Sequence, residues 1–440
     1  PLMTKPEVLE RGVILPGDNG QAACPVVKDF SQPLSLPEAV DLALCNNPQL
    51  RASWAAIKQQ AGVLGEARAA YLPTLNGSLN RTSDEIHASG TYKTEVTQNT
   101  GQAGLTWRLL DFGGRSAGHE TAKNLLAAAL ASHDATLQKL LTAVIQAYHD
   151  ALTARAVLRA KEEALVIAGN TLRSAQSREA KGAASRSDAL QAATAQAKVG
   201  LERNRAQGEY EKSLSVLRYV LGVMDQPTIL LPQEVEDAPG EGLAKLLHDW
   251  LEEARRHPAI LAARSQLEAS RERVSVARSA ALPSLNLSAN YYRNTRPGDA
   301  VTYSDTRETT AGLVVSVPIF EGFASTYRVQ EAQAQVEQQE ATLADTEQQI
   351  AMAVVKAHAD ATAALANLDA SATLLKAARE SLEVSQRKYF LGAADVTELL
   401  NVQNALADAH LERIRSLAEW RSARLRLAAS AGQMGRDGVR

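Results

Sequence analysis

The chain has 440 residues, a formal net charge of −3 and only 4% aromatic residues. It is rich in Ala, Leu, Gln, Glu and Arg, a composition that favours long helices packed through small side chains. Acidic and basic residues are interspersed, which argues against nucleic acid as a partner. The sequence has no run of about 18 apolar residues, which excludes an ordinary transmembrane helix.

Residues 1–34 form a predicted N-terminal arm without an apolar signal core. Such an N-terminus could be a mature end whose signal peptide was removed, but the sequence alone does not establish this. No hydrophobic stretch precedes Cys24, so we expect no lipid on that cysteine. In an oxidising compartment Cys24 and Cys45 could form a disulfide that joins the arm to the first helix. Two unpaired cysteines are the alternative.

The sequence contains a tandem repeat with an offset of 210 positions. Pro48 recurs as Pro258 (258 − 48 = 210), and the segment AYLPTLN at 70–76 recurs as AALPSLN at 280–286. The glycine of the later segment KGAA recurs at the same offset (392 − 182 = 210). The repeat predicts the following organisation: a first copy at 35–223, a linker at 224–241, a second copy at 242–432 and a tail at 433–440.

Each copy begins with a predicted helix. In the first copy Ser35 precedes a proline and then Glu38, the pattern of a capped helix start. The helix is expected to run to about Ala70, with a break at Pro48. In the second copy the matching helix is expected from about residue 242 to 281.

A strand pair follows in each copy. Along residues 285–291 the odd positions are apolar and the even positions are polar, and residues 311–317 alternate similarly. Residues 75–80 and 102–109 show the same pattern more weakly. Period-two alternation predicts strands with one apolar and one polar face. We expect β-hairpins at about 74–112 and 284–320.

Glycines at 113–114 and at 322 mark the turn into a long helix in each copy, expected at 115–181 and 324–390. At 1.5 Å per residue, some 65 residues reach about 100 Å. A glycine turn then leads to a returning helix, expected at 187–221 and 396–429. The hairpin tips fall at about 182–187 and 392–397.

Four strands in one chain are too few to close a barrel, which needs about eight. Three chains would supply twelve strands, an even number suited to an outer-membrane barrel. The apolar face would then meet lipid, and the long helices would continue the barrel as a tube. The fold predicted is mainly α with β: a long antiparallel α-helical barrel with four strands per chain in a 12-stranded trimeric barrel. A soluble periplasmic coiled-coil adaptor or scaffold is the alternative of another class.

The chain resembles the TolC-like outer-membrane factors. The resemblance covers about residues 35–432 and is carried by YLP at 71–73 and ALP at 281–283, by LLDFGGR at 109–115 and PIFEG at 318–322, and by the two hairpin tips. Each motif alone is weak, but the ordered set in duplicate is specific. The resemblance implies a homotrimeric channel-tunnel in the outer membrane of a Gram-negative bacterium, with a long periplasmic extension.

The resemblance also implies partners. These would be a periplasmic adaptor (membrane fusion protein) and an inner-membrane ABC exporter or proton-driven pump, together with outer-membrane lipid. Without an acyl cysteine, the chain looks like the branch that includes the outer components of type I protein secretion, including toxin secretion. A drug or small-molecule efflux pump is the alternative.

The resemblance places a gate at the hairpin tips. Glu398 matches one carboxylate of an acidic ring, whereas Asn401 stands where the other would be. Asp188 and Tyr389 match a closing contact between the two hairpins. Ala394 replaces a gate arginine, for which Arg186 or Arg387 could substitute. The small residues of the tips are expected to dock the adaptor: Gly182, Ala183, Ala184, Gly392, Ala393 and Ala394. As alternatives, Asp188 and Glu398 are ordinary acids at helix starts, and the tips are plain turns.

The sequence predicts no enzyme, no cofactor and no metal site. Residues 111–113 read DFG, as in kinases, but no phosphate-binding loop or catalytic loop accompanies them. The histidines in the helical segments have no second histidine and no cysteine at i+4.

Overall fold

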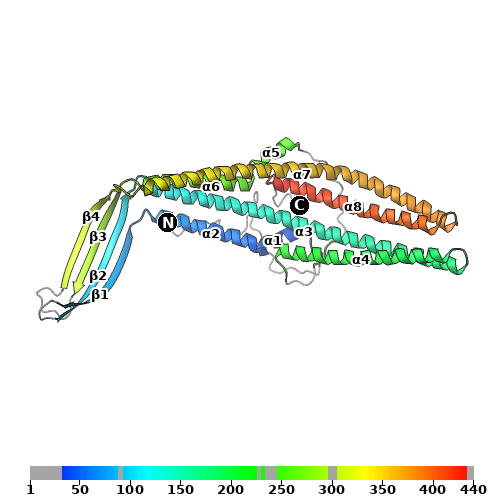
Figure 1. Cartoon of the computed structure of the whole chain (residues 1–440), viewed down its shortest axis with the longest axis horizontal. Coiled ribbons are helices and arrows are strands. Elements are labelled where there is room, and N and C mark those ends of the chain that lie inside the picture. The colour runs from blue at the N-terminus through cyan, green and yellow to red at the C-terminus, as the bar shows by residue number, and fades with distance from the viewer. Residues whose placement is uncertain (1–31, 88–92, 225–228, 233–244, 296–304, 434–440) are drawn as a thin grey trace. The chain divides into compact units, whose positions relative to one another are not determined.

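The computed structural model describes residues 32–87, 93–224, 229–232, 245–295 and 305–433 (Figure 1). The described chain divides into two units. The sheet unit comprises residues 55–131 and 261–345, and the helical unit comprises residues up to 54, 132–260 and those from 346 onward. Among the described residues, no helix is both long and apolar enough to cross a membrane.

Eight helices and four strands follow one another along these residues. In chain order they are α1 (Leu36–Asn46), α2 (Pro48–Ala69), β1 (Thr74–His87), β2 (Lys93–Leu110), α3 (Gly114–Ala180), α4 (Arg186–Leu221), α5 (Leu247–Ala254), α6 (Pro258–Ser279), β3 (Ser284–Thr295), β4 (Asp305–Ser316), α7 (Ala324–Phe390) and α8 (Val396–Ser430). The two halves repeat the same order, with two helices, two strands and two helices in each. This order of long helices and four strands confirms the predicted fold class, mainly α with β.

The first helix starts as its sequence pattern predicts. Ser35 forms a capping box with Glu38, whose carboxylate accepts from the Ser35 N–H at 2.9 Å. The predicted break at Pro48 separates α1 from α2. Asn47 stabilises this break, because its side chain accepts from the Gln49 N–H at 2.9 Å and donates to the carbonyl of Val220 at 3.1 Å. In the second copy residue 242 lies outside the described residues, and α5 begins at Leu247.

The four strands form one antiparallel sheet in the order β1-β2-β3-β4. The two hairpins are joined because β2 also pairs with β3, with Leu105 opposite Ala289. A register shift lies between Arg108 and Leu110 at the helix end of this pairing. The fourth strand ends at Ser316, four residues short of the end predicted at 320. Pro318 follows two residues later, and a proline cannot donate a ladder hydrogen bond.

Residues paired across neighbouring strands point to the same side of a sheet. The register therefore gathers the apolar residues on one face, which we call the apolar face: Leu75, Leu79, Leu105, Trp107, Leu287, Ala289, Leu313 and Val315. These side chains are solvent-accessible in the single chain, and Leu79 is 93% exposed. The opposite, polar face carries mainly Asn, Ser, Thr and Gly, with Arg108 near one end and Val314 as an apolar exception.

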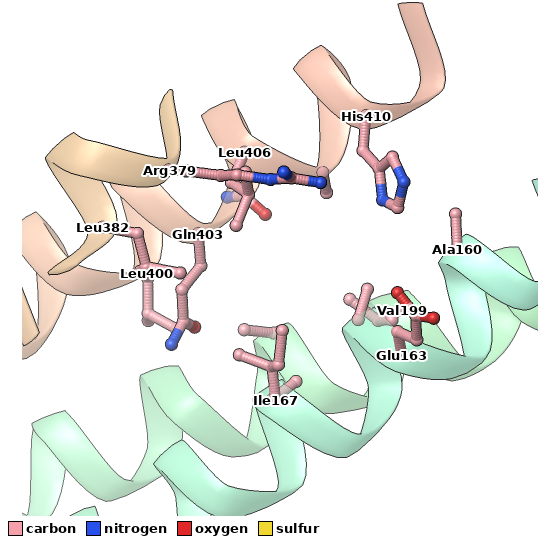
Figure 2. A pocket seen from close by; sticks show the side chains of 15 residues that line it. Ala160, Glu163, Ile167, Val199, Arg379, Leu382, Leu400, Gln403, Leu406 and His410 are labelled. Atoms are coloured by element: carbon pink, nitrogen blue, oxygen red, sulfur yellow. The ribbon is translucent and has the colours of Figure 1, made fainter. Parts of the chain in front are cut away.

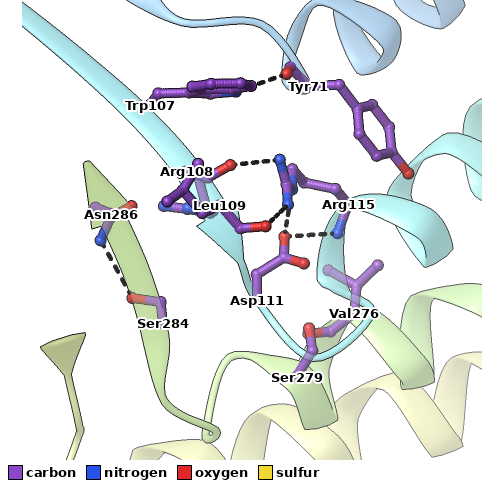
Figure 3. Close-up of polar contacts among 10 residues, drawn as sticks. All are labelled: Tyr71, Trp107, Arg108, Leu109, Asp111, Arg115, Val276, Ser279, Ser284 and Asn286. Carbon is purple, nitrogen blue, oxygen red and sulfur yellow. Dashed lines mark hydrogen bonds and ion pairs between the residues drawn. The ribbon is translucent and has the colours of Figure 1, made fainter. Parts of the chain in front are cut away.

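A buried ion pair fixes the turn from β2 into α3 (Figure 3). The carboxylate of Asp111 accepts from the backbone N–H and the Nε of Arg115, at 2.9 and 3.0 Å. The Arg115 guanidinium also donates to the carbonyls of Arg108 and Leu109 and lies 5.0 Å from the ring centre of Tyr71. Both side chains of the pair are about 86% buried, with exposures of 13% and 14%. The glycine-rich DFG motif is therefore a structural turn.

Buried apolar clusters hold the helical unit together, and they differ in whether leucine or alanine predominates. In Figure 1, α4 lies beside α3 and α8 lies beside α7, so each long helix forms a hairpin with its return helix. One buried cluster joins α1, α3 and α4 through Leu137, Leu141, Leu217 and Leu221. A second cluster joins α5, α7 and α8 and consists largely of alanines around Trp420. Alanine-rich contacts allow helix backbones to approach closely.

Candidate gate at the helical hairpin tips

The two hairpin tips are built alike. Gly182 and Gly392 adopt left-handed φ values of +69° and +78°. One residue further on, Ala183 and Ala393 donate backbone hydrogen bonds of 2.8 Å to the carbonyls of Arg178 and Lys388. This arrangement is a Schellman C-cap, which requires a residue that tolerates the left-handed conformation. The predicted 210-residue correspondence of the tips therefore holds at the level of individual hydrogen bonds.

The acidic residues that follow each turn lie in the first turn of the return helix. Asp188 forms a capping box with Ser185, in which the Ser185 N–H donates to Asp188 Oδ2 at 3.2 Å. Glu398 occupies the equivalent position in α8, and its N–H donates to Asp395 Oδ1 at 2.8 Å. Its carboxylate is free of the cap, is 46% exposed and lies 3.7 Å from Lys388 Nζ. Asn401 is also exposed, one turn further along α8. An acidic ring stays a prediction.

Tyr389 is the most buried residue of the predicted gate, at 3% exposure. It packs in a cluster that joins both hairpins, with Ala175 and Ala189 on one side and Leu382 and Leu399 on the other. Its hydroxyl is buried and has no hydrogen-bond partner among the described residues. Asp188 is engaged in its own cap, so the predicted Asp188–Tyr389 contact stays a prediction.

Arg178 connects the two hairpins and was missed by sequence reasoning. From the last turn of α3 its Nη1 donates to the backbone carbonyl of Tyr389 at 2.6 Å. Its guanidinium carbon also lies 4.7 Å from the centre of the Tyr389 ring. Stacking and hydrogen bonding by one guanidinium give a contact that lysine reproduces poorly. A basic residue in a last helical turn is also explained by the helix dipole, so no sequence signal marked Arg178.

The two arginines that the sequence suggested as substitutes lie elsewhere. Arg387 forms an ion pair with Glu383 one turn back on its own helix. Arg186 is exposed at the first position of α4. Within the described chain, neither residue forms a hydrogen bond or an ion pair with the other hairpin. Two further polar contacts do join the hairpins, from Thr397 to Gln191 at 3.0 Å and from Gln403 to Thr171 at 2.8 Å.

A cavity of about 170 Å³ lies further along the helices, between the hairpins (Figure 2). Its wall is largely apolar, with Ile167 and Val199 on one hairpin and Leu382, Leu400 and Leu406 on the other. Figure 2 also shows the polar groups of Glu163, Arg379 and His410 at this cavity. Packing between the hairpins is therefore less complete here than at Tyr389.

The predicted docking residues at the tips are accessible. Gly182, Ala183, Gly392 and Ala393 are exposed, whereas Ala184 and Ala394 are half-buried. Phe390 and Leu391 beside the second tip are 71% and 85% exposed. Their role in docking stays a prediction.

Other predicted features have no bearing on the gate. Cys45 lies in α1, but Cys24 lies outside the described residues, so the disulfide stays a prediction. Among the described residues, no group of three or more His, Cys, Asp or Glu side chains could hold a metal ion.

Comparison with protein families identifies the chain. The model of the outer membrane efflux protein family matches residues 39–223 and 250–433. The chain belongs to the outer membrane efflux protein family. The two matched segments correspond to the two copies of the repeat, so each copy carries the family's pattern. The predicted resemblance is confirmed.

Individual relatives support the same assignment. The chain is 37% identical to Protein CyaE of Bordetella pertussis, over 96% of this chain and 90% of that protein. It is 24% identical to the outer membrane efflux protein BepC of Brucella suis, over 98% of this chain and 91% of that protein. It is also 24% identical to the proteases secretion protein PrtF of Dickeya chrysanthemi, over 92% and 89%.

Solved structures show the same fold. The outer membrane protein VceC of Vibrio cholerae aligns with a TM-score of 0.78 at 20% identity, over 90% of this chain and 96% of that one. The open state of the MtrE outer membrane channel of Neisseria gonorrhoeae aligns with a TM-score of 0.77 at 18% identity, over 95% and 98%. The chain is therefore an export channel protein of the outer membrane, and its family and fold are those of transport channels.

Proposed function

We propose that three copies of this chain form a passive exit duct, in which twelve strands close a barrel in the outer membrane. The observation that carries the proposal is the single four-stranded sheet with an exposed apolar face. Four strands cannot close on themselves, and β1 and β4 are unpaired edges within the described chain. Three-fold assembly would pair these edges and place the apolar face against lipid.

The exported substrate is proposed to be a protein, delivered by a periplasmic adaptor and an inner-membrane ABC exporter. The resemblance to outer components of type I secretion supports this choice, as does the relative PrtF, whose name assigns it to protease secretion. Efflux of small molecules is the second candidate. It is supported by BepC and by OpmQ of Pseudomonas aeruginosa, a pyoverdine export protein that is 29% identical over 60% of this chain.

Deletion of the gene separates these candidates. If the duct serves protein secretion, the deletion strain should lose one or a few proteins from its culture medium while its susceptibility to antibiotics stays unchanged. An unchanged set of secreted proteins together with increased antibiotic susceptibility would favour efflux. Membrane fractionation tests the channel itself, because a chain found only in the soluble periplasm contradicts an outer-membrane duct.

The exposed carboxylate of Glu398 is proposed to line the constriction. Three copies would form a ring that attracts cations, and Lys388 at 3.7 Å would offset part of that charge. We expect Glu398→Gln to reduce the cation preference of the purified channel in planar bilayers. Lys388→Gln should increase this preference. Unchanged ion selectivity in both variants would remove Glu398 from the constriction.

A further inference from the structure

On the side of the sheet that bears the apolar face, charged side chains replace apolar ones toward the end far from the helices. Two adjacent rows there carry charge, and the register defines them as Leu79–Gly101–Arg293–Arg307 and Arg81–Asn99–Thr295–Asp305. They contain three arginines and one aspartate, and therefore a net charge of +2. Tyr291 lies on the same face, one row closer to the apolar residues.

The height of these rows matches the edge of a lipid bilayer. Arg293 is eight residues from Leu285, which begins the apolar part of β3, and this separation spans about 27 Å along a strand. A strand tilted by about 40° converts that length to about 21 Å along the membrane normal, close to the apolar band of about 25 Å in outer-membrane barrels. Glu85, which lies on the same side of β1 as Arg81, is about 14 Å further along the strand.

Two of the arginine side chains contact Asp305 and remain accessible to solvent. Arg293 donates to Asp305 from Nε at 3.3 Å and from Nη2 at 3.1 Å, and Arg307 Nη2 lies 3.9 Å from the same carboxylate. The two guanidinium side chains are 54% and 66% exposed. One aspartate therefore positions two arginines but neutralises only one of them. Within the described residues, Arg81 has no ion pair.

A hollow of about 400 Å³ lies between Arg81 and Arg293, above Gly101. A Cβ atom at position 101 would lie 3.3 Å from Leu79 Cδ2, so any larger side chain would extend into this space. The hollow is continuous with the apolar face, because Leu79 lines it. It therefore offers charge to a headgroup and apolar surface to an attached acyl chain.

We propose that Arg81, Arg293 and Arg307 bind the phosphate groups of an anionic lipid of the outer leaflet, with its acyl chains against the apolar face. This inference rests on the proposed function, in which that face meets lipid. Guanidinium groups bind phosphate oxygens through paired hydrogen bonds, and Asp305 holds two of the three guanidinium groups in place. A free phosphate ion would use the same arginines but would leave Leu79 uncovered, so the continuity of the surface favours the lipid.

Native mass spectrometry of the purified full-length protein with diphosphoryl lipid A tests this binding. Each arginine near an anionic lipid surface contributes enough to change affinity about fivefold. We expect Arg81→Gln to weaken lipid binding about fivefold and Arg293→Gln/Arg307→Gln to weaken it more than twentyfold. The matched control is Arg108→Gln, which removes the same charge from the polar face and should leave binding unchanged.

Three results would overturn the inference. They are wild-type affinity in the arginine variants, an equal loss in Arg108→Gln, and release of the lipid by millimolar inorganic phosphate, which would indicate a free phosphate site. Membrane fractionation distinguishes a wrong lipid site from a wrong assignment as an outer-membrane duct. Variants that remain in the outer membrane and bind lipid A normally refute only the lipid site, whereas a wild-type protein absent from the membrane refutes both.

Discussion

The contact between Arg178 and Tyr389 should hold the two hairpins of each chain together in the closed channel. We expect Arg178→Ala to raise the ratio of open to closed time in planar-bilayer recordings. The lost cation–π contact is worth about 1 kcal/mol at a half-buried site. The lost charged hydrogen bond to the Tyr389 carbonyl is worth about 1.5 kcal/mol. Together, about 2.5 kcal/mol per copy corresponds to a change of roughly 60-fold.

Three further variants make this experiment specific. Tyr389→Phe should leave the ratio unchanged, because the Tyr389 hydroxyl has no partner in the described chain and the phenyl ring still accepts the guanidinium. Arg178→Lys should fall between wild type and alanine. Arg387→Ala is the charge control, because its ion pair stays within α7. If Arg178→Ala stays within threefold of wild type while Tyr389→Phe opens the channel, the hydroxyl holds the gate and the present reasoning is wrong.

Three other predictions concern stability. Gly222→Ala should lower the unfolding temperature, because φ is +71° and a Cβ would lie 2.9 Å from the backbone of Asn46 at the end of α1. Gly208→Ala should raise the unfolding temperature, because a Cβ at this helical position would meet no atom within 4 Å. Burial lowers the pKa of His133 in the folded state. The contribution of the neutral imidazole to folding stability is therefore complete above about pH 6.5 and is lost as pH falls through the lowered pKa of the folded state. His133→Gln should reduce the loss of thermal stability between pH 8 and pH 5. Asp111→Ala should cost about 3 kcal/mol in urea unfolding by leaving Arg115 buried without its partner, and a loss below 1 kcal/mol would contradict that account.

Much of the fold follows from local patterns in the sequence. The 210-residue repeat predicts two equivalent halves, and period-two alternation predicts which strand residues share a face. The break at Pro48 and the glycine turns follow from backbone stereochemistry. The pairing of β2 with β3 does not, because it joins residues such as Leu105 and Ala289 that are far apart in the sequence.

The contacts at the candidate gate could not be predicted from the sequence. Asp188 and Glu398 occupy first-turn positions that the helix dipole alone would explain, and the structure shows Asp188 in such a cap. Arg178 is separated from Tyr389 by 211 positions, and nothing in its neighbours indicates the stacking partner. A single sequence specifies helices and turns locally, whereas contacts between two hairpins depend on how the helices pack.

The two copies differ in how each long helix is joined to the preceding strand. The first junction uses Asp111 and Arg115, which are largely buried and bonded to strand carbonyls. The second uses Glu321 and Arg328 at 3.2 Å, with exposures of 36% and 49%. An exposed pair contributes at most about 1 kcal/mol, whereas breaking a buried pair costs about 3 to 5 kcal/mol. The start of α7 is therefore less firmly attached than the start of α3. We expect movement of the α7–α8 hairpin to meet little resistance at that junction, so contacts such as Arg178 with Tyr389 would supply most of the closure that we predict.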